Sequence, residues 1–555
     1  MYKNLANFIT LLESTSEVKK IATEVNPDKE ISEIVDRMSK EPGGGSALLF
    51  ESSGTEFPVL CNMMGSERRM ALALGLNSLD EVPGLVADLL GELKKPRKTL
   101  FDKLSILPVL GKAGKWFPKH SKRRGECQSV IYRDGEVDLS ILPILKTWPH
   151  DGGRFVTLPL VNTVDPENGE TNLGMYRMQV IDKKTTAMHW HIHKTGANHY
   201  EKYKTLGKRM PVAVCLGGDP AITYAATAPL PEGIDEYILA GFLRKKPVKL
   251  VKCITCDLEV PSSCDIVIEG YVDPMEEKFI EGPFGDHTGF YSLKDRYPLF
   301  HVTAITHRKG AVYPTTLVGV PPMEDRYIAE VSEKIFAEPI KAVIAPEITS
   351  LRMPWQGVAH NLAVVAIKKN FDAQGLKVAS ALWGAGQMSF CKIIWIAERD
   401  YSDTELQSIL LRGTKFTAEV VLNSGVADVL EHASEEIGRG GKMCVDTTSS
   451  KAREWQITVK FDTGVESLND DEKMWLLLAN VDPSRDVIIT EGSIEINAQS
   501  KKLQERDFPN IVTMDDATIS KVDSRWEEYN IGEFIPSPSL RYKKLIKGDA
   551  AEQQF

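Results

Sequence analysis

The chain has few cysteines, no long apolar run and no excess of positive charge. Its 8 cysteines among 555 residues are too sparse for a disulfide scaffold and are typical of a reducing compartment. No apolar stretch approaches the ~18 residues of a transmembrane helix, and the first segment carries Glu13 early and has no small-residue cleavage site. The formal net charge of −10 argues against a nucleic-acid partner. We therefore expect a cytoplasmic protein that neither spans a membrane nor binds nucleic acid.

Two common signatures are incomplete. Cys253-Ile-Thr-Cys256 has no second C-x-x-C pair and no thioredoxin-like context, which favours two buried strand cysteines. Gly217-Gly-Asp-Pro220 lacks the G-x-G-x-x-G order, so it predicts no dinucleotide fingerprint. Neither motif contributes to the functional prediction.

Length and patterning predict three domains and a tail, because 555 residues exceed what one core usually organises. Residues 1–125 alternate helical and strand-like stretches and end in a basic connector. Residues 126–322 carry short β-type runs separated by turn signals such as Asn168-Gly169, which is typical of a barrel. The α/β alternation returns over 323–530, and 531–555 form a tail. The predicted class is a multidomain α/β (α+β) fold.

The third domain shows a weak internal repeat. A strand, helix and strand over 394–425 is echoed over 457–492, which indicates a partial duplication of one βαβ unit. In the tail, the basic run from Arg541 to Lys547 has two interpretations. It either docks on a partner subunit or forms a solvated basic end.

Three histidines alternate in His189-Trp-His-Ile-His193. In a strand, residues i, i+2 and i+4 share one face, so all three imidazoles could enter one pocket. Such a set suits Zn, Mn or Fe. The alternative is a polar barrel face with one or two hydrogen-bonded histidines.

Two further runs carry groups suited to acid–base chemistry. Glu281-Gly-Pro-Phe-Gly-Asp286 places two carboxylates on a Gly/Pro-shaped turn, where they can converge if the turn folds back. Asn172-Leu-Gly-Met-Tyr-Arg177 offers an arginine that could clamp a carboxylate or phosphate. Asn172 and Arg177 have opposite strand parity, so they share a site only if the strand bends near Gly174. Solvent-exposed turns are the alternative for both runs.

Taken together, these runs resemble the UbiD family of decarboxylases. The resemblance extends from about Pro58 to Asp486 and is densest between Trp148 and Asp295. It rests on long, ordered runs: Asn172–Arg177, Val251-Lys-Cys with Asp257-Leu-Glu-Val-Pro261, Ile268-Glu-Gly-Tyr271 and Glu281–Gly289.

The resemblance implies a fold and two bound groups. The central domain would be a split β-barrel like that of flavin reductases, holding prenylated FMN, and the C-terminal α/β domain would contribute to dimerisation. A divalent metal, usually Mn2+, would link the cofactor phosphate to Asn172, His193 and Glu236, a donor set suited to that ion. The family also allows a monovalent ion such as K+ near the phosphate.

The resemblance also assigns roles around the flavin. Arg177, Glu281 and Asp286 match the family's catalytic set. Lys392 matches a lysine that reaches the cofactor from the following domain. The other residues expected at the cofactor are Met175, Tyr176, His189, Trp190, His191, Lys194 and Thr195, and the backbone at Arg177 should contact it as well. Members often have arginine where His189 and Lys194 stand.

The implied reaction is loss of CO2 from an unsaturated or aromatic acid, for which the cofactor supplies the electron sink. Arg177 would orient the carboxylate, and a protonated Asp286, with Glu281 as alternative, would deliver H+ to the carbon. The expected partners are a flavin prenyltransferase as cofactor supplier and further copies of this chain in a homodimer or higher assembly.

The substrate and class remain open at this level. The run Gly319-Val-Pro-Pro-Met-Glu-Asp325 and the long C-terminal half resemble members of menaquinone biosynthesis, which implies a dihydroxynaphthoate-type acid. A 4-hydroxybenzoate-type acid of ubiquinone biosynthesis is the runner-up. From other classes, a zinc hydrolase using His189, His191 and His193 and a non-catalytic flavin-binding or assembly protein are retained.

Overall fold

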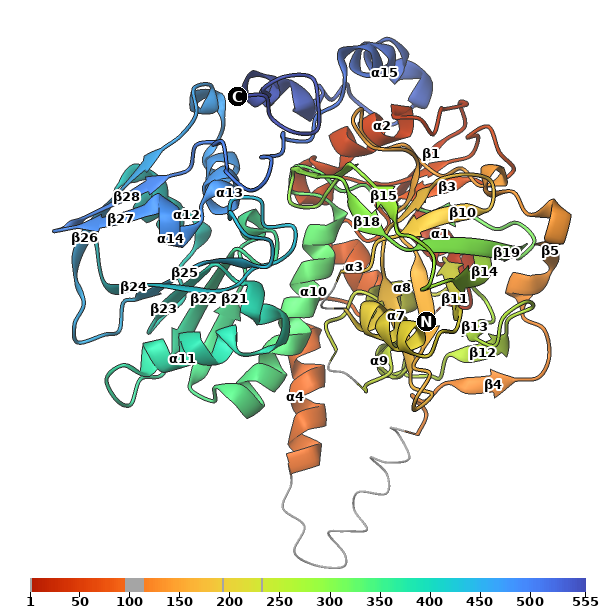
Figure 1. The fold of residues 1–555 in the computed structure, drawn as a ribbon, viewed down its shortest axis with the longest axis horizontal. Coiled ribbons are helices and arrows are strands. Elements are labelled where there is room, and N and C mark those ends of the chain that lie inside the picture. Colours follow the sequence, from red (N-terminus) through yellow and green to blue (C-terminus); the bar gives the residue numbers. More distant parts are fainter. Residues whose placement is uncertain (1, 95–113, 192–193, 231–232) are drawn as a thin grey trace, which may run out of the picture.

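The computed structural model describes residues 2–94, 114–191, 194–230 and 233–555. The chain forms two lobes, and helix α10 (Glu324–Pro339) runs between them (Figure 1). One lobe contains the N-terminal layer and the central sheet, and the other contains the C-terminal α/β unit. This arrangement confirms the multidomain α/β class. No described helix has the length and apolarity that a membrane crossing requires.

The N-terminal layer is a four-stranded sheet in the order β1-β2-β3-β20 with helices packed on it. Its inner strand β2 is fully buried, as the apolar run Ala47–Phe50 predicts. The last strand, β20 (Tyr313–Pro314), comes from the end of the central domain and so ties the two together. The other elements are α1 (Leu5–Ser14), β1 (Val18–Ile21), α2 (Glu30–Ser39), β3 (Val59–Cys61), α3 (Glu67–Leu74) and α4 (Glu81–Lys94).

The central domain contains one curled, antiparallel sheet in the order β6-β9-β10-β19-β14-β11-β7-β8, with β5 also paired to β19. Apolar side chains of its inner face form the largest buried cluster together with the N-terminal strands. Its strands are β5 (Val130–Arg133), β6 (Phe155–Val156), β7 (Leu160–Val164), β8 (Thr171–Met175), β9 (Met178–Val180), β10 (Thr185–Met188), β11 (Met210–Leu216), β14 (Ile266–Val272) and β19 (Leu299–His307).

Helices and two- or three-stranded ribbons connect the strands of this sheet. Helix α7 (Thr195–Thr205) follows the histidine-rich segment, and α9 (Glu236–Arg244) follows α8 (Pro220–Ala225). The ribbons are β12 (Lys249–Lys252) with β13 (Glu259–Pro261) and β4 (Lys119–Ser121), β15 (Phe279–Glu281) with β18 (Asp295–Tyr297), and β16 (Phe284–Gly285) with β17 (Tyr291–Ser292).

The C-terminal lobe is an eight-stranded sheet in the order β21-β22-β23-β25-β24-β26-β28-β27. Its buried centre, β22 (Leu362–Ile367) and β23 (Ile393–Ala397), pairs in parallel. The remaining elements are β21 (Ile348–Arg352), α11 (Gln374–Trp383), α12 (Asp403–Arg412), β24 (Phe416–Val426), β25 (Arg439–Asp446), β26 (Arg453–Lys460), α13 (Asp470–Asn480), α14 (Pro483–Asp486), β27 (Val487–Thr490) and β28 (Ser493–Asn497).

The repeat in this lobe is larger than a βαβ unit. In each copy a strand leads through a helix to an antiparallel hairpin, and the hairpin's second strand pairs in parallel with the first strand. The copies are β23-α12-β24-β25 and β26-α13-β27-β28, with the same spatial order.

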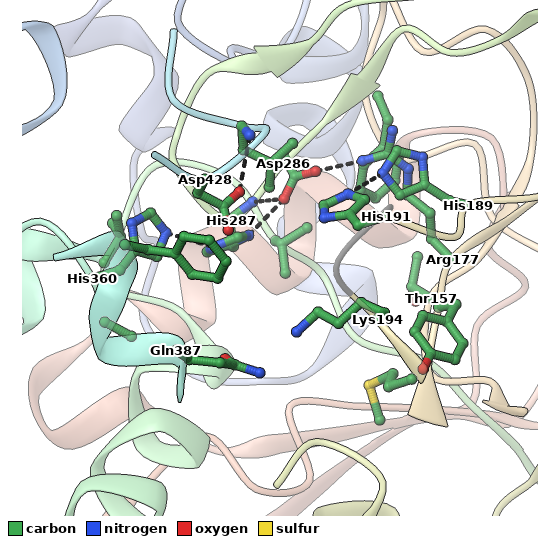
Figure 2. Close-up of a pocket in the computed structure, with 18 of the residues that line it drawn as sticks. Thr157, Arg177, His189, His191, Lys194, Asp286, His287, His360, Gln387 and Asp428 are labelled. Atoms are coloured by element: carbon green, nitrogen blue, oxygen red, sulfur yellow. Dashed lines mark hydrogen bonds and ion pairs between the residues drawn. The ribbon is translucent and has the colours of Figure 1, made fainter. Parts of the chain in front are cut away.

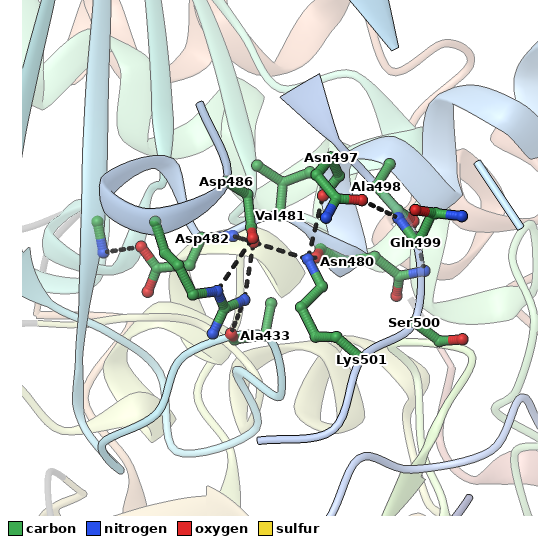
Figure 3. Close-up of polar contacts among 12 residues, drawn as sticks. Ala433, Asn480, Val481, Asp482, Asp486, Asn497, Ala498, Gln499, Ser500 and Lys501 are labelled. Carbon is green, nitrogen blue, oxygen red and sulfur yellow. Dashed lines mark hydrogen bonds and ion pairs between the residues drawn. The ribbon is translucent and has the colours of Figure 1, made fainter. Parts of the chain in front are cut away.

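In the second copy Lys501 donates to the carbonyls of Asn480 and Asn497, both at 3.0 Å, and pairs with Asp486 at 2.8 Å (Figure 3).

The C-terminal segment packs on its own chain, which corrects the interpretation of a solvated basic end, while docking on a partner subunit stays a prediction. Helix α15 (Asp516–Tyr529) lies against α2 (Figure 1), where Tyr529 donates a hydrogen bond to the buried Glu30 at 2.8 Å. Further on, Tyr542 is buried and donates to Glu472 at 3.0 Å, and Arg541 pairs with the same carboxylate at 3.0 Å. The basic run is therefore not a free end.

Candidate active site

A cavity of about 380 Å³ lies where the central sheet meets the C-terminal lobe. Figure 2 shows histidines and acidic side chains from both lobes facing this space. The size falls within the range of small-molecule sites. Of the residues predicted from the sequence, the lining includes Met175, Tyr176, Arg177, His189, His191, Lys194 and Asp286.

Arg177 joins the two carboxylates of the Glu281–Asp286 turn. It lies in the break between β8 and β9. Its Nε and Nη2 donate to the two oxygens of Glu281 at 2.7 and 3.0 Å, and its Nη1 donates to Asp286 at 2.5 Å. The turn folds back because β15 ends at Glu281 and β16 begins at Phe284, whose ring stacks 4.5 Å below the guanidinium carbon.

Electrostatics hold this cluster ionised. Burial raises the pKa of Glu281, but the charges of Arg177 and His189 outweigh it and lower the pKa to about 2. Burial likewise opposes the charge on Asp286, yet hydrogen bonds and charge from His287, with Arg177, hold its pKa well below the usual range. In this state neither carboxyl group carries the proton that the sequence-based mechanism assigned to Asp286.

The histidine segment differs from the predicted strand. The ladder of β10 ends at Met188, so His189 and His191 lie in an irregular segment beyond it. Their Nε2 atoms nevertheless approach to 2.5 Å, and Nδ1 of His189 lies 3.2 Å from Glu281. Burial, reinforced by the neighbouring imidazole, lowers the pKa of His191 to about 3. His193 lies outside the described residues.

Three ionisable lining residues, His287, His360 and Asp428, were missed by sequence reasoning. Nδ1 of His287 lies 2.6 Å from Asp286, and its Nε2 lies 3.4 Å from Nε2 of His360 in the other lobe. Asp428 faces the same imidazoles, and its charge acts to raise the pKa of both. Burial disfavours the charge on His287, but the contact with Asp286 raises its pKa to about 9. His287 stood within a motif that was read for its carboxylates, whereas nothing marked His360 or Asp428.

Asn172 and Glu236 meet at the far end of β8. Asn172 is buried in β8, and a Glu236 oxygen accepts the amide of the next residue, Leu173, at 2.8 Å. Burial raises the pKa of Glu236 to about 7, and no cation pairs with it in the described chain. The half-buried carboxyl group of Glu236, next to the side-chain amide of Asn172 and without a cation among the described residues, is suited to binding a metal ion.

Lys194, at the start of α7, lines the cavity. Lys194 caps α7 and Thr195 begins it, so amides at this end point outward, as anion sites require. Burial lowers the pKa of the Lys194 ammonium, which makes no ion pair with a described carboxylate. Tyr176 folds back over Gly174, and it packs edge-on against Trp190 at 6.5 Å.

Lys392 does not line the cavity. Its ammonium is buried in the C-terminal lobe, where it pairs with Glu431 at 2.8 Å and donates to the carbonyls of Ala479 and Val481 at 3.2 and 3.1 Å. Those carbonyls belong to the segment that Lys501 and Asp486 fix (Figure 3). Its predicted contact with a cofactor stays a prediction.

Sequence comparisons match all three parts of the chain to one family. The descriptions are the N-terminal domain (residues 9–89), the Rift-related domain (119–321) and the C-terminal domain (326–447) of 3-octaprenyl-4-hydroxybenzoate carboxy-lyase, UbiD. An uncharacterized protein of Aquifex aeolicus is 43% identical over 481 residues, covering 85% of this chain and 98% of that protein. An uncharacterized protein of Archaeoglobus fulgidus is 41% identical, covering 86% and 99%.

Solved structures show the same fold. Vanillic acid decarboxylase of Sedimentibacter hydroxybenzoicus in its closed form matches with a TM-score of 0.70 at 23% identity, over 81% of this chain and 93% of that one. The UbiD-class enzyme HmfF of Pelotomaculum thermopropionicum, in complex with FMN, matches with a TM-score of 0.65 at 24% identity, over 80% and 94%. From these matches and the domain coverage, the chain belongs to the UbiD family.

Proposed function

We propose that this chain is a carboxy-lyase that removes CO2 from an aromatic or α,β-unsaturated acid with the help of prenylated FMN. The observation that supports it best is the Arg177–Glu281–Asp286 cluster, in which Arg177 and Asp286 line the cavity and Glu281 holds Arg177 from behind. A fixed guanidinium next to two carboxylates and an aromatic face suits a planar anionic substrate. The intact acid–base set also argues against a non-catalytic flavin-binding role.

The donor set fits the proposed cofactor. The Lys194 cation and the start of α7 suit a phosphate, while Asn172 and Glu236 offer oxygen ligands for a divalent ion such as Mn2+, with His193 as the proposed third ligand. When bound, prenylated FMN would supply the electron sink that loss of CO2 from an unsaturated carbon requires. K+ near the phosphate and contacts from Met175, Tyr176 and Trp190 belong to the same proposal.

The residues of the chain divide the work between binding and proton transfer. Arg177 orients the substrate carboxylate, and Glu281 stays ionised and fixes the guanidinium by two hydrogen bonds. Asp286 is ionised before substrate enters, so it needs a source for the proton it delivers. Protonated Nδ1 of His287, 2.6 Å away, is that source. Asp286 thus relays the proton to the carbon that has lost CO2.

For the substrate we propose a dihydroxynaphthoate-type acid of quinone biosynthesis, on the basis of the 319–325 run and the long C-terminal half. A 4-hydroxybenzoate-type acid is the alternative, in keeping with the name of the matching family. The zinc-hydrolase alternative is not favoured, because His189 engages both Glu281 and His191. We also propose a cytoplasmic homodimer or higher assembly supplied by a flavin prenyltransferase.

The test is CO2 release from a panel of hydroxylated naphthoates, hydroxybenzoates and unsaturated acids by protein co-expressed with a flavin prenyltransferase and purified without air. Arg177→Lys is the inactive comparison. Release that depends on co-expression and on Arg177 supports the proposal. Turnover without the prenyltransferase, or equal turnover by Arg177→Lys, would refute it.

A further inference from the structure

The Cys253-Ile-Thr-Cys256 motif, which the proposed function does not use, meets a buried acid in the fold. Cys253 and Cys256 lie in the turn between β12 and β13, and both are half-buried rather than sequestered in a strand. The sequence-based interpretation of buried strand cysteines is therefore wrong for this pair. The thiol of Cys256 donates to the carbonyl of Val212, with the two atoms 4.0 Å apart.

The acid is Glu269, in the middle of β14. One ligand atom from each of Cys253, Cys256 and Glu269 lies within 4.8 Å of the other two. Glu269 follows Cys256 by 13 positions and lies on another strand, so no spacing rule for zinc motifs reveals it. The third ligand that the sequence lacked is thus supplied by the tertiary fold.

Glu269 is buried without a cation from the described residues beside it. Its side chain is 0% exposed, and no lysine, arginine or histidine of the described chain forms an ion pair with it. Buried carboxylates are normally paired with a cation or bound to a metal. Here, within the part of the chain that the structure describes, the Glu269 carboxyl oxygens have only hydrogen-bond donors of the turn as partners.

Those donors leave one oxygen available and hold the turn in place. Oε2 accepts the amides of Ile254 and Thr255, at 2.8 and 2.6 Å, and the Thr255 hydroxyl at 3.0 Å. Oε1 accepts only the Ile254 amide, at 2.9 Å, so it keeps acceptor capacity. Glu269 therefore fixes the backbone between the two cysteines and still presents an oxygen to them.

The geometry points to a zinc site formed by Cys253, Cys256 and Glu269. Two thiolates and a carboxylate are ligands that zinc takes, and its fourth position would face solvent through the half-exposed turn. Binding releases the two thiol protons. The ion would tie the β12–β13 turn to β14, a central strand of the curled sheet. None of the three residues lines the cavity.

The experiment is metal analysis of the purified full-length chain after incubation with zinc and removal of loose ion. Because the proposed site at Glu236 could also take zinc, Glu236→Ala is the background for every variant. Cys256→Ser tests the site, and Cys444→Ser, a buried cysteine of the C-terminal lobe, is the matched control. We expect near-stoichiometric zinc in the background protein and the control, and its loss in Cys256→Ser.

Cobalt gives a readout that does not depend on folding stability alone. In the Glu236→Ala background, Co2+ should produce a thiolate-to-cobalt charge-transfer band that Glu269→Gln weakens and Cys256→Ser abolishes. Circular dichroism verifies that each variant is folded. Zinc content that is negligible in the background protein, zinc retained by Cys256→Ser, or a Cys253–Cys256 disulfide under reducing conditions would each overturn the site.

Discussion

Asp286 lies between two cations, with His287 Nδ1 at 2.6 Å from one oxygen and Arg177 Nη1 at 2.5 Å from the other. The arrangement keeps the carboxylate ionised and stores a proton on the neighbouring imidazole. It also makes the stability of this part of the fold depend on pH.

The first prediction concerns that dependence. The folded-state pKa of His287 is raised from 6.5 to about 9, so its stabilising contribution is fully present below pH 6.5 and is lost as the pH rises through 9. The ring is 30% exposed, toward the cavity, so we expect on the order of 1 kcal/mol. The free energy of unfolding of the wild type should fall over this window by that much more than in His287→Asn. Parallel curves for the two proteins would contradict the assignment.

The second prediction concerns the clamp. Arg177→Lys keeps the charge but loses the fork that contacts Glu281 and Asp286 together, so kcat/KM for the best acid should fall by about 10²-fold or more. Flavin content, measured by absorbance, should stay close to wild type. Arg296→Lys, at an exposed arginine of the same lobe, is the control and should retain full activity. Loss of flavin in Arg177→Lys would instead indicate a role in holding the cofactor.

The third prediction concerns the cation site. Glu236→Gln removes the negative charge next to Asn172, so both manganese and flavin should be lost on purification. The unfolding temperature of the cofactor-free protein should not fall, because the substitution removes an acid that has no cation of the described residues beside it. Glu201→Gln, at an exposed acid of α7, is matched in chemistry and should retain both. Metal analysis and the flavin absorbance decide between these outcomes, and retained manganese in Glu236→Gln would place the ion elsewhere.

The fourth prediction concerns Gly174. A Cβ at this residue would lie 2.4 Å from the Tyr176 ring, so Gly174→Ala must displace a ring that lines the cavity. We expect a loss of about 1–3 kcal/mol in unfolding free energy and lower flavin content. Gly91→Ala in α4, where a Cβ meets nothing within 4 Å, should be neutral or slightly stabilising. Equal stability and flavin content in both variants would show that Tyr176 can move freely.

Sequence reasoning reached the site mainly where short runs carried several functional groups. Arg177, Glu281 and Asp286 came from two such runs, and the convergence of the two carboxylates was expected from the Gly/Pro-shaped turn between them. His360 and Asp428 come from the other lobe, and contacts between lobes leave no local periodicity. Glu269 was missed because it lies on β14 while its partners lie in the turn between β12 and β13, so no local spacing connects them.

The fold class followed from the alternation of strands and helices, but some details depended on tertiary contacts. The repeat read as a βαβ unit because its third strand, β25 or β28, returns in a hairpin and pairs beside the first. The tail looked basic and solvated because its anchors, Tyr542 and Leu545, bury only against the rest of the fold. The domain boundaries at 125, 322 and 530 stay predictions.

The tail supplies the fifth prediction. Tyr542→Ala removes a buried ring and its hydrogen bond to Glu472, so the free energy of unfolding should fall by about 3 kcal/mol. Leu540→Ala, at a side chain that is 51% exposed, should change it by no more than about 0.5 kcal/mol. Denaturant titration measures both. A small change in unfolding free energy for Tyr542→Ala would indicate that the tail does not pack stably on the rest of the chain.

The central claim is that this cavity holds prenylated FMN for decarboxylation. The most direct measurement is the absorbance spectrum of the chain after co-expression with a flavin prenyltransferase and purification without air, recorded beside Glu236→Gln prepared in the same way. The account predicts a flavin spectrum that differs from that of ordinary FMN and is absent from the variant. A colourless wild-type protein, or one that carries zinc alone, would contradict it.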